Sequence, residues 1–347
     1  MQVIKNHLKS QKPMNDIHSI QKIHQAYEEI RRQTAEVIIG QGHVLEEMFI
    51  ALLSRGHCLL EGAPGLGKTL LVRTVASALS LEFQRIQCTP DLMPGDITGS
   101  EMFLHSAESH GMNFAPGPIF TNILLADEIN RTPPRTQSAL LEAMQEFQVT
   151  VGRKRHPLPA PFFVLATQNP IEQEGTYPLP EAQLDRFMFK IRVDYPSAEE
   201  EMNILLRTTG IQEECITPVL DAETLLAAAE LVRRVPVAES VVRFACEICR
   251  KSRPSSENPG KDEFSSWIRK TVSWGAGPRA GQSLILGAKA RAMLAGRFCA
   301  EREDVEQLAF PVLRHRIQTS FVAAAEGISS EDVVRSILDE CREYDKR

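Results

Sequence analysis

GAPGLGKT, which runs from Gly62 to Thr69, is the stretch that decides the fold. It has the spacing Gly-x-x-x-x-Gly-Lys-Thr, and it stands between an apolar, strand-like run (His57–Glu61) and a helical pattern. A phosphate-binding loop (P-loop) requires this spacing and these flanks. Its glycines allow backbone N–H groups to turn toward phosphate oxygens, and the following helix points its positive end at them. The alternative is a glycine-rich turn without a ligand, which does not account for the Lys-Thr pair.

Two side chains of this loop predict the cofactors. In a P-loop the lysine, here Lys68, neutralises the charge of the β- and γ-phosphates, and the hydroxyl of Thr69 is a ligand of Mg²⁺. We therefore expect ATP or ADP together with Mg²⁺. The residues predicted to hold the nucleotide through this loop are Gly62, Ala63, Pro64, Gly65, Leu66, Gly67, Lys68, Thr69 and Leu70.

A second apolar run, Asn122–Asp127, ends in two adjacent carboxylates, Asp127 and Glu128. Taken alone, this is the solvated end of a strand, because acidic side chains are mostly exposed. After a P-loop a different interpretation applies. Asp127 is then the second ligand of Mg²⁺, and Glu128 is the general base that polarises the attacking water. Consecutive strand residues point in different directions, so one can face the metal and the other the water.

The order of apolar patterns predicts the domain organisation. Between Val37 and about Tyr195, strand-like runs alternate with helical patterns, which indicates an α/β core with a parallel sheet flanked by helices. Strand signals disappear after Pro196, so we expect an all-helical second domain. The expected parts are an N-terminal helical extension (residues 1–33), the core (residues 34–196) and the helical domain (residues 197–347), with an exposed loop at residues 250–266. The candidate strands of the sheet are His57–Glu61, Glu82–Gln87, Asn122–Asp127, Phe162–Thr167 and Phe187–Val193.

Composition excludes some classes of function. The net charge of −6 argues against a general nucleic-acid binder, although a local basic patch is compatible with it. Seven scattered cysteines are not a disulfide framework. Cys246 and Cys249 form one C-x-x-C without a second pair or a histidine couple, so we interpret them as small apolar residues. No apolar run approaches the ~20 residues that span a bilayer, and no signal peptide is recognisable, which predicts a cytoplasmic protein.

Beyond these two motifs, seven stretches are informative, namely Val37–Gln41, Gly56–Thr69, Thr89–Phe103, Phe114–Val151, Ala166–Phe187, Gly275–Ala280 and Pro311–Ile317. Through them, residues 34–347 resemble the MoxR family of AAA+ ATPases. The resemblance implies a P-loop AAA+ core with a parallel β-sheet flanked by helices, followed by an all-helical lid domain. The family often has a small residue where this chain has Gly67, a slight departure toward the general P-loop pattern.

The resemblance assigns roles to residues outside the two motifs. Asn169 matches sensor 1, whose amide positions the lytic water and contacts the γ-phosphate, although an Asx turn before a proline is the structural alternative. Arg186 matches the arginine finger, which reaches the nucleotide of a neighbouring subunit. Its alternative is a surface arginine paired with Asp185. Arg279 matches sensor 2, at the start of a lid helix that touches the nucleotide. The segment that borders the adenine is Ile39, Gly40 and Gln41.

Two insertions mark a subgroup of this family. Residues 95–118 resemble its insert within a helix, and residues 147–158 resemble its hairpin before sensor 1, predicted here to turn at Gly152–Lys154. In the family's rings these segments face the central pore or one rim. The basic tip Gly152–Arg155 is either a solvated turn or a contact to an acidic partner or nucleic acid.

The resemblance implies a chaperone-like ATP hydrolase that remodels or matures partner proteins. Its members form homo-oligomers, here expected to be hexameric rings, and commonly act with von Willebrand factor A domain proteins. The sequence does not name the client protein. Two alternatives remain at this point: a nucleic-acid-dependent motor, because related proteins with the same hairpin move DNA, and a nucleotide-gated scaffold with little turnover. The acidic net charge disfavours the first, and the intact site residues disfavour the second.

Overall fold

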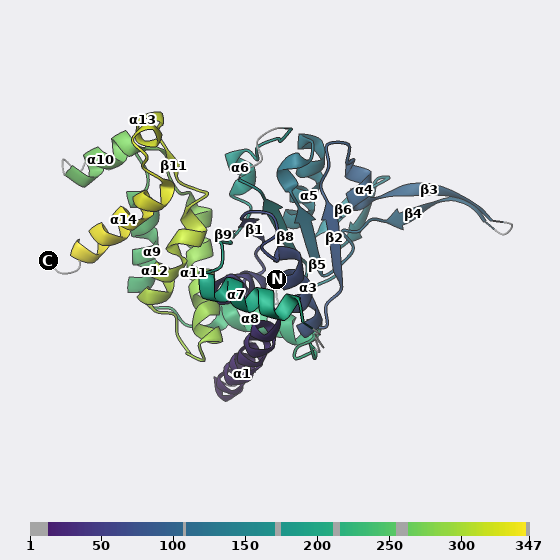
Figure 1. Ribbon diagram of the computed structural model, residues 1–347, viewed down its shortest axis with the longest axis horizontal. Helices are drawn as coiled ribbons and strands as arrows, with labels where there is room; N and C mark the ends of the chain where they lie inside the picture. The colour runs from purple at the N-terminus through teal and green to yellow at the C-terminus, as the bar shows by residue number, and fades with distance from the viewer. Residues whose placement is uncertain (1–12, 107–108, 171–174, 211–215, 255–262, 345–347) are drawn as a thin grey trace, which may run out of the picture.

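The structure is a computed structural model that describes residues 13–106, 109–170, 175–210, 216–254 and 263–344 (Figure 1). Its core is a parallel sheet that has five strands in the described residues, in the order β2-β5-β8-β1-β9. Each expected strand is found, with ends displaced by no more than two residues. The strands are β1 (Cys58–Glu61), β2 (Phe83–Gln87), β5 (Ile123–Asp127), β8 (Phe163–Gln168) and β9 (Phe189–Arg192).

Both faces of this sheet are covered by helices, which is why its central strands are continuous apolar runs. Residues Ile123–Ala126 of β5 and Phe163–Thr167 of β8 are buried without alternation. Because the strands are parallel, their carboxyl ends meet at one edge of the sheet, and their amino ends meet at the opposite edge. The helices of the core are α2 (Gly42–Leu53), α3 (Lys68–Ala78), α4 (Pro94–Thr98), α5 (Pro134–Glu146) and α6 (Glu181–Leu184).

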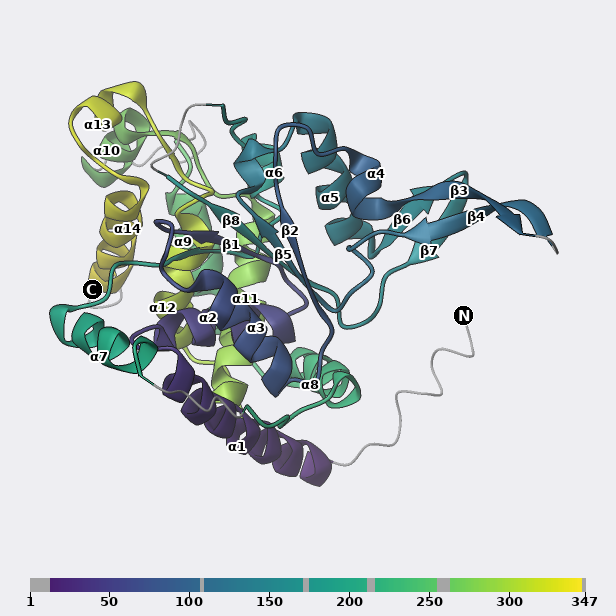
Figure 2. The ribbon, with the colours of Figure 1, turned by 45° about the vertical axis from the view of Figure 1, so that its right-hand side comes forward.

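The helical extension expected near the N-terminus is the long helix α1 (Pro13–Val37), while residues 1–12 lie outside the described residues. Ile20, Ile23, Tyr27 and Ile30 of this helix are buried, whereas Ile17 is 45% exposed. Figure 2 shows α1 lying along one side of the molecule, next to α3 and α8. The helix also packs on α11 of the second domain, so it contacts both parts of the molecule.

Two hairpins extend from the core. The hairpin expected at residues 147–158 is confirmed as β6 (Gln148–Val151) and β7 (Lys154–Pro157). Residues 95–118 contain a second and longer hairpin, β3 (Gly99–Ser106) and β4 (Ser109–Pro116), which the sequence pattern did not predict. Figure 1 shows this arm projecting far from the sheet, where it has no core to generate an apolar pattern. The rings of Phe114 and His156 stack with their centroids 3.9 Å apart and join the two hairpins.

The second domain is helical, with two corrections to the expected picture. Its strands β10 (Val272–Trp274) and β11 (Gln318–Thr319) form a short antiparallel ribbon, which is too short for a detectable periodicity. The loop expected at residues 250–266 is wrong at both ends, because α9 continues to Lys251 and α10 begins at Glu263; residues 255–262 lie outside the described residues. The helices are α7 (Ala198–Thr208), α8 (Ala222–Arg234), α9 (Glu239–Lys251), α10 (Glu263–Thr271), α11 (Pro278–Leu294), α12 (Arg302–Leu313), α13 (Phe321–Ala325) and α14 (Ser330–Tyr344).

None of the described helices combines the length and the apolar character needed to cross a bilayer.

Candidate functional site

The P-loop has the backbone shape that phosphate binding needs. Gly65 and Gly67 have φ angles of +82° and +72°, which favour glycine, and α3 begins directly after them at Lys68. No atom lies within 4 Å of a Cβ added to either glycine, so the loop faces open space. The amide groups of such a loop and the first turn of α3 form a site for anions.

Lys68 is held in a position from which it can move to a phosphate. Its Nζ donates hydrogen bonds to the carbonyl oxygens of Gly62 at 2.6 Å and Ala63 at 2.9 Å. Burial lowers the pKa of Lys68, and the nearby carboxylates of Asp127 and Glu128 oppose that shift. A triphosphate would offer this ammonium group charged oxygens in place of two neutral carbonyls. The loop therefore fits the phosphates of ATP or ADP.

The two carboxylates lie at the carboxyl edge of the sheet, as predicted, and they have partners that the sequence did not reveal. Asp127 Oδ1 accepts a hydrogen bond from Thr167 Oγ1 at 2.6 Å, and Asp127 Oδ2 accepts one from Arg85 Nη2 at 2.6 Å. Thr167 Oγ1 also accepts a hydrogen bond from the backbone N–H of Glu128 at 2.8 Å. One threonine hydroxyl therefore fixes both acidic residues relative to β8.

Glu128 occupies an unusual backbone conformation for a residue with a side chain, with φ of +58°. Its Oε2 accepts hydrogen bonds from Arg131 Nη1 at 3.0 Å and from Gln87 Nε2 at 3.2 Å. Left-handed backbone of this kind costs about 1–3 kcal/mol and is concentrated at functional sites. It turns the carboxylate of Glu128 away from the line of β5, so that it does not duplicate the position of Asp127.

The oxygen donors of this edge suit Mg²⁺. The hydroxyl of Thr69 and the carboxylate of Asp127 are hard ligands, and Mg²⁺ usually takes one or two protein ligands together with phosphate oxygens. Within the described ranges, no group of three or more His, Cys, Asp or Glu side chains could hold a metal without such help. The donor set therefore fits a cation that arrives with a nucleotide.

The adenine segment is joined directly to the P-loop. Gln41 Nε2 donates a hydrogen bond to the carbonyl oxygen of Leu66 at 2.7 Å. Gln41 Oε1 is buried and has no hydrogen-bond partner among the described residues, so it is available to accept one from an amino group such as that of adenine. Position 40 favours glycine, because its φ of +81° lies in the left-handed region. Through Gln41, the segment Ile39–Gln41 is joined to the P-loop, and its contact with adenine stays a prediction.

Asn169 is buried directly after β8, the strand between β5 and β1. The sheet order therefore places it at the carboxyl edge, between the carboxylates and the P-loop.

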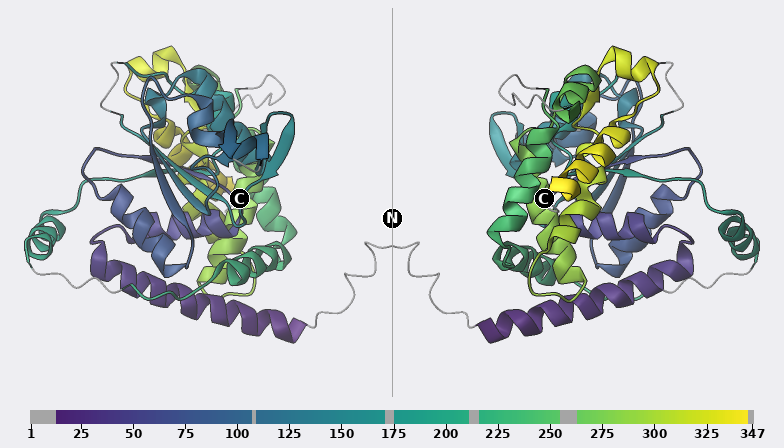
Figure 3. Two further views of the ribbon diagram at one scale, coloured as in Figure 1. Left: turned by 90° about the vertical axis from the view of Figure 1, so that its right-hand side faces the viewer. Right: turned by 90° about the vertical axis from the view of Figure 1, so that its left-hand side faces the viewer.

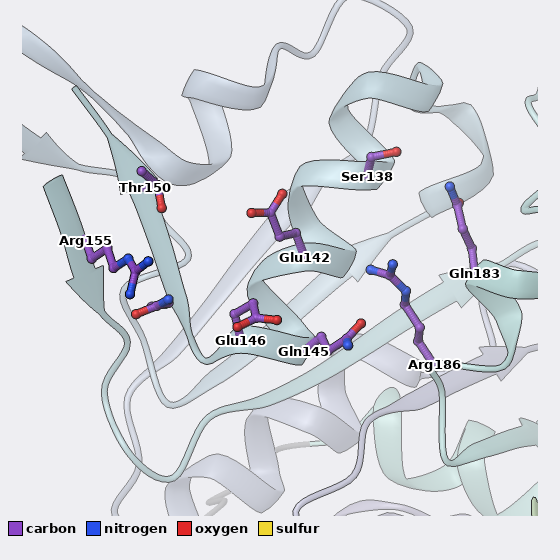
Figure 4. Close-up of a pocket in the computed structure, with 9 residues that line it drawn as sticks. Ser138, Glu142, Gln145, Glu146, Thr150, Arg155, Gln183 and Arg186 are labelled. Atoms are coloured by element: carbon purple, nitrogen blue, oxygen red, sulfur yellow. The ribbon is translucent and has the colours of Figure 1, made fainter. Parts of the chain in front are cut away.

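Arg186 lies at the opposite end of the sheet from the P-loop, where the parallel strands begin. Met188 N donates to the carbonyl oxygen of His57, so the chain enters β9 level with the amino end of β1. From that level to Gly62 the sheet extends five residues, or about 16 Å at ~3.3 Å per residue. Figure 4 shows Arg186 extending from the segment after α6 into a polar groove of about 520 Å³ beside α5. In this structure Arg186 therefore lies on a different side of the molecule from the P-loop.

Arg279 is on the same side as Arg186. It stands in the first turn of α11, and its Nη1 is 3.2 Å from Asp185 Oδ2. Asp185 also accepts a hydrogen bond from Arg316 Nε at 2.7 Å. Asp185 thus pairs with two arginines of the helical domain, and the guanidinium of Arg186 has no ion pair within the described part of the chain.

Sequence reasoning missed Arg85, Gln87, Arg131 and Thr167. Arg85 and Gln87 stand two apart on β2, and therefore on one face, but only the sheet order shows that this face borders Asp127. Thr167 is the last residue of the expected strand Phe162–Thr167, and nothing in that apolar run marks its hydroxyl as a partner of Asp127. Arg131 follows Glu128 by three residues, and this spacing is the one feature of the sequence that indicates their ion pair.

Comparisons with known proteins agree with this geometry. Residues 57–189 match the family described as "ATPase family associated with various cellular activities (AAA)", and residues 265–337 match the "AAA lid domain". Chaperone MoxR1 of Mycobacterium tuberculosis is 42% identical over 93% of this chain and 82% of its own length. Protein MoxR of Paracoccus denitrificans is 31% identical over 87% of this chain and 91% of its own. The crystal structure of a Cytophaga hutchinsonii protein classed as an ATPase has a TM-score of 0.85 and 37% identity, covering 93% of this chain and 96% of its own.

Proposed function

This chain belongs to the MoxR family of AAA+ ATPases, and we propose that it hydrolyses ATP to ADP and phosphate at the carboxyl edge of its sheet. Lys68 leaves the carbonyls of Gly62 and Ala63 to bind the β- and γ-phosphates. Thr69 and Asp127 would hold Mg²⁺, which would neutralise charge on the phosphates. Glu128 accepts the proton of the attacking water, and the Asn169 amide orients that water.

We infer further that the nucleotide site is shared between subunits of a homo-oligomer. The observation that carries this proposal is the separation of Arg186 from the P-loop, at opposite edges of one sheet. An arginine so placed is remote from its own subunit's nucleotide but can reach that of a neighbour. Contacts of this head-to-tail kind close into rings when the rotation allows it, and we propose a hexamer.

The biological role that we propose is chaperone-like remodelling of a partner protein, together with a von Willebrand factor A domain protein. The name of the Mycobacterium tuberculosis relative, a chaperone, supports this role. A nucleic-acid-dependent motor is the second candidate, and the basic residues Arg153 and Lys154 at the tip of the β6–β7 hairpin favour it. The net charge of −6 opposes it. Stimulation of ATP turnover by DNA or RNA would favour the motor, and stimulation by a von Willebrand factor A domain protein would favour the remodeller.

Two variants test the ATP site. Lys68→Ala should lose ATP binding, because the loop then lacks its mobile cation. Glu128→Gln should bind ATP without turnover, because the metal ligand Asp127 remains and the base is gone. Binding of a fluorescent ATP analogue and release of phosphate measure the two effects separately. Glu223→Gln, which changes an exposed carboxylate on α8, is the control. Near-normal affinity in Lys68→Ala or normal turnover in Glu128→Gln would refute the assignment.

A further inference from the structure

The helix α7 exposes an apolar stripe that is not covered in the structure. None of its residues is buried, and Met202, Leu205 and Leu206 are 56%, 58% and 68% exposed. These three share one face, because residues three and four apart are neighbours on a helix. Figure 3 shows α7, coloured teal-green, at the margin of the molecule. An amphipathic helix that presents its apolar face to solvent is typical of a surface that binds a partner.

The opposite face of α7 is attached beside the nucleotide site. Glu200 lies so close to the adenine segment that a Cβ on Gly40 would come within 2.6 Å of Glu200 Oε1. Arg207 Nη1 donates a hydrogen bond to the carbonyl oxygen of Ala35, near the end of α1. Since residues 200 and 207 are two turns apart, they share the attached face, and the apolar stripe points away from it. α7 therefore lies on the P-loop side of the subunit.

A groove whose lining complements the surface of α7 lies in the helical domain, between α9 and α11. Its volume is about 820 Å³, its apolar residues include Val242, Ala245, Ile285 and Leu286, and none of its lining residues is acidic. Three arginines stand around it, namely Arg233, Arg250 and Arg253. Pro278 lines the groove, and the next residue, Arg279, pairs with Asp185. The groove therefore lies on the side of the subunit that carries Arg186.

We propose that α7 of one subunit docks into the α9–α11 groove of the neighbouring subunit. In the first turn of α7, Glu199 and Glu201 flank the apolar stripe and match the basic surround of the groove, and the stripe itself matches the apolar lining. This inference rests on the shared nucleotide site proposed above. In such an assembly the P-loop side of one subunit faces the Arg186 side of the next, which brings α7 and the groove to the same interface. The contact ties the adenine segment of one subunit to the helical domain of its neighbour.

A native cysteine makes this proposal testable. Cys246 lines the groove and is exposed. In Leu205→Cys, mild oxidation of the assembled protein should produce disulfide-linked dimers and a ladder of longer species, visible on a non-reducing gel. These species should be lost when Cys246→Ser is added. Asn203→Cys is the matched control, because that position is exposed on α7 but about 160° around the helix from Leu205. A mixture of Leu205→Cys/Cys246→Ser with wild-type chains should give only dimers that contain one chain of each kind.

The outcomes separate this inference from the proposed function. Assembly and Arg186-dependent ATP turnover without a cross-link to Cys246 would overturn the docking of α7 and leave the shared site intact. Equal cross-linking from Asn203→Cys would also overturn it, because random collision would then explain the dimer. A chain that stays monomeric and hydrolyses ATP as a monomer would overturn both. As an independent test, Leu205→Asp should weaken assembly and leave the ATP affinity of the isolated subunit unchanged.

Discussion

Glu47, on α2, is a carboxyl group that the fold removes from water. Burial raises its pKa from 4.5 to about 7; nearby Arg314 opposes this shift and Glu46 adds to it. Since the pKa in the folded state is above that in the unfolded state, the folded protein binds this proton more tightly. The resulting stabilisation is fully present below pH 4.5 and is lost as the pH rises through about 7.

Glu47→Gln should remove this part of the pH dependence, because the amide has nearly the same shape and does not ionise. Between about pH 4.5 and 7.5 the free energy of unfolding of the variant should gain on the order of 3 kcal/mol relative to wild type. Urea unfolding at a series of pH values measures the difference. The buried His57 and His315 are present in both proteins, so their titration cancels. Parallel pH curves for the two proteins would contradict the prediction.

At this scale the sequence predicts the members of a motif better than their partners. Lys68, Asp127 and Glu128 were recognisable because each stands at a fixed distance along the chain from glycines or from a strand end. Arg85 and Thr167 hold Asp127 from two different strands, one on each side of β5. Strand order in space is decided by packing, so no local pattern identifies these two side chains.

Among the elements, β9 is an edge strand, and the helical domain covers it. Arg316, which follows α12, donates hydrogen bonds to the carbonyl oxygens of Phe187 at 2.7 Å and Met188 at 3.0 Å. Its Nε pairs with Asp185, and its side chain is only 2% exposed. The guanidinium therefore binds the carbonyl groups of the segment that leads into β9, and it fixes the segment that contains Arg186 to the helical domain.

Arg316→Met should destabilise the protein by about 3 kcal/mol, because it removes a buried guanidinium that binds Asp185 and two carbonyl groups. Arg279 and His315 would still contact Asp185 and the carbonyl group of Phe187, but the carbonyl group of Met188 would lose this donor. Arg342→Met is the matched control. It breaks an exposed pair with Glu306, and such pairs contribute about 0–1 kcal/mol. Denaturant unfolding of both variants measures the difference. Equal, small losses in both would show that Arg316 does not join the domains.

The strands of the buried sheet could be predicted from the sequence, whereas the β3–β4 arm and the β10–β11 ribbon could not. The sheet strands were found because burial on both faces makes them continuous apolar runs. The β3–β4 arm projects from the core, and its residues Gly99–Pro116 include serines, histidines and glycines without a regular alternation. The β10–β11 ribbon has strands of three and two residues, which are too short to establish an alternation. Both depend on contacts that appear only when the chain is folded.

For the whole molecule, the shared site that we propose means that one subunit carries half of two different sites. Specific activity should therefore rise with protein concentration over the range in which the subunits assemble. Arg186→Ala should lower turnover by about 10³-fold or more, as for arginine fingers of other NTPases. The ATP affinity of the isolated subunit should remain, because Arg186 does not reach its own nucleotide. A surface role for Arg186 predicts almost no loss of turnover instead.

Mixing two inactive variants gives the sharpest test of the shared site. Arg186→Ala keeps an intact P-loop and lacks the finger, whereas Lys68→Ala keeps the finger and cannot bind ATP. In a randomly mixed ring with equal amounts of each, about one quarter of the interfaces combine an intact P-loop with an intact Arg186. Phosphate release should therefore recover on mixing, while each variant alone remains inactive. Exchange between subunits must be shown separately, by native mass spectrometry of the mixture. If exchanged rings recover no activity, each nucleotide is hydrolysed within one subunit, and Arg186 is not a finger.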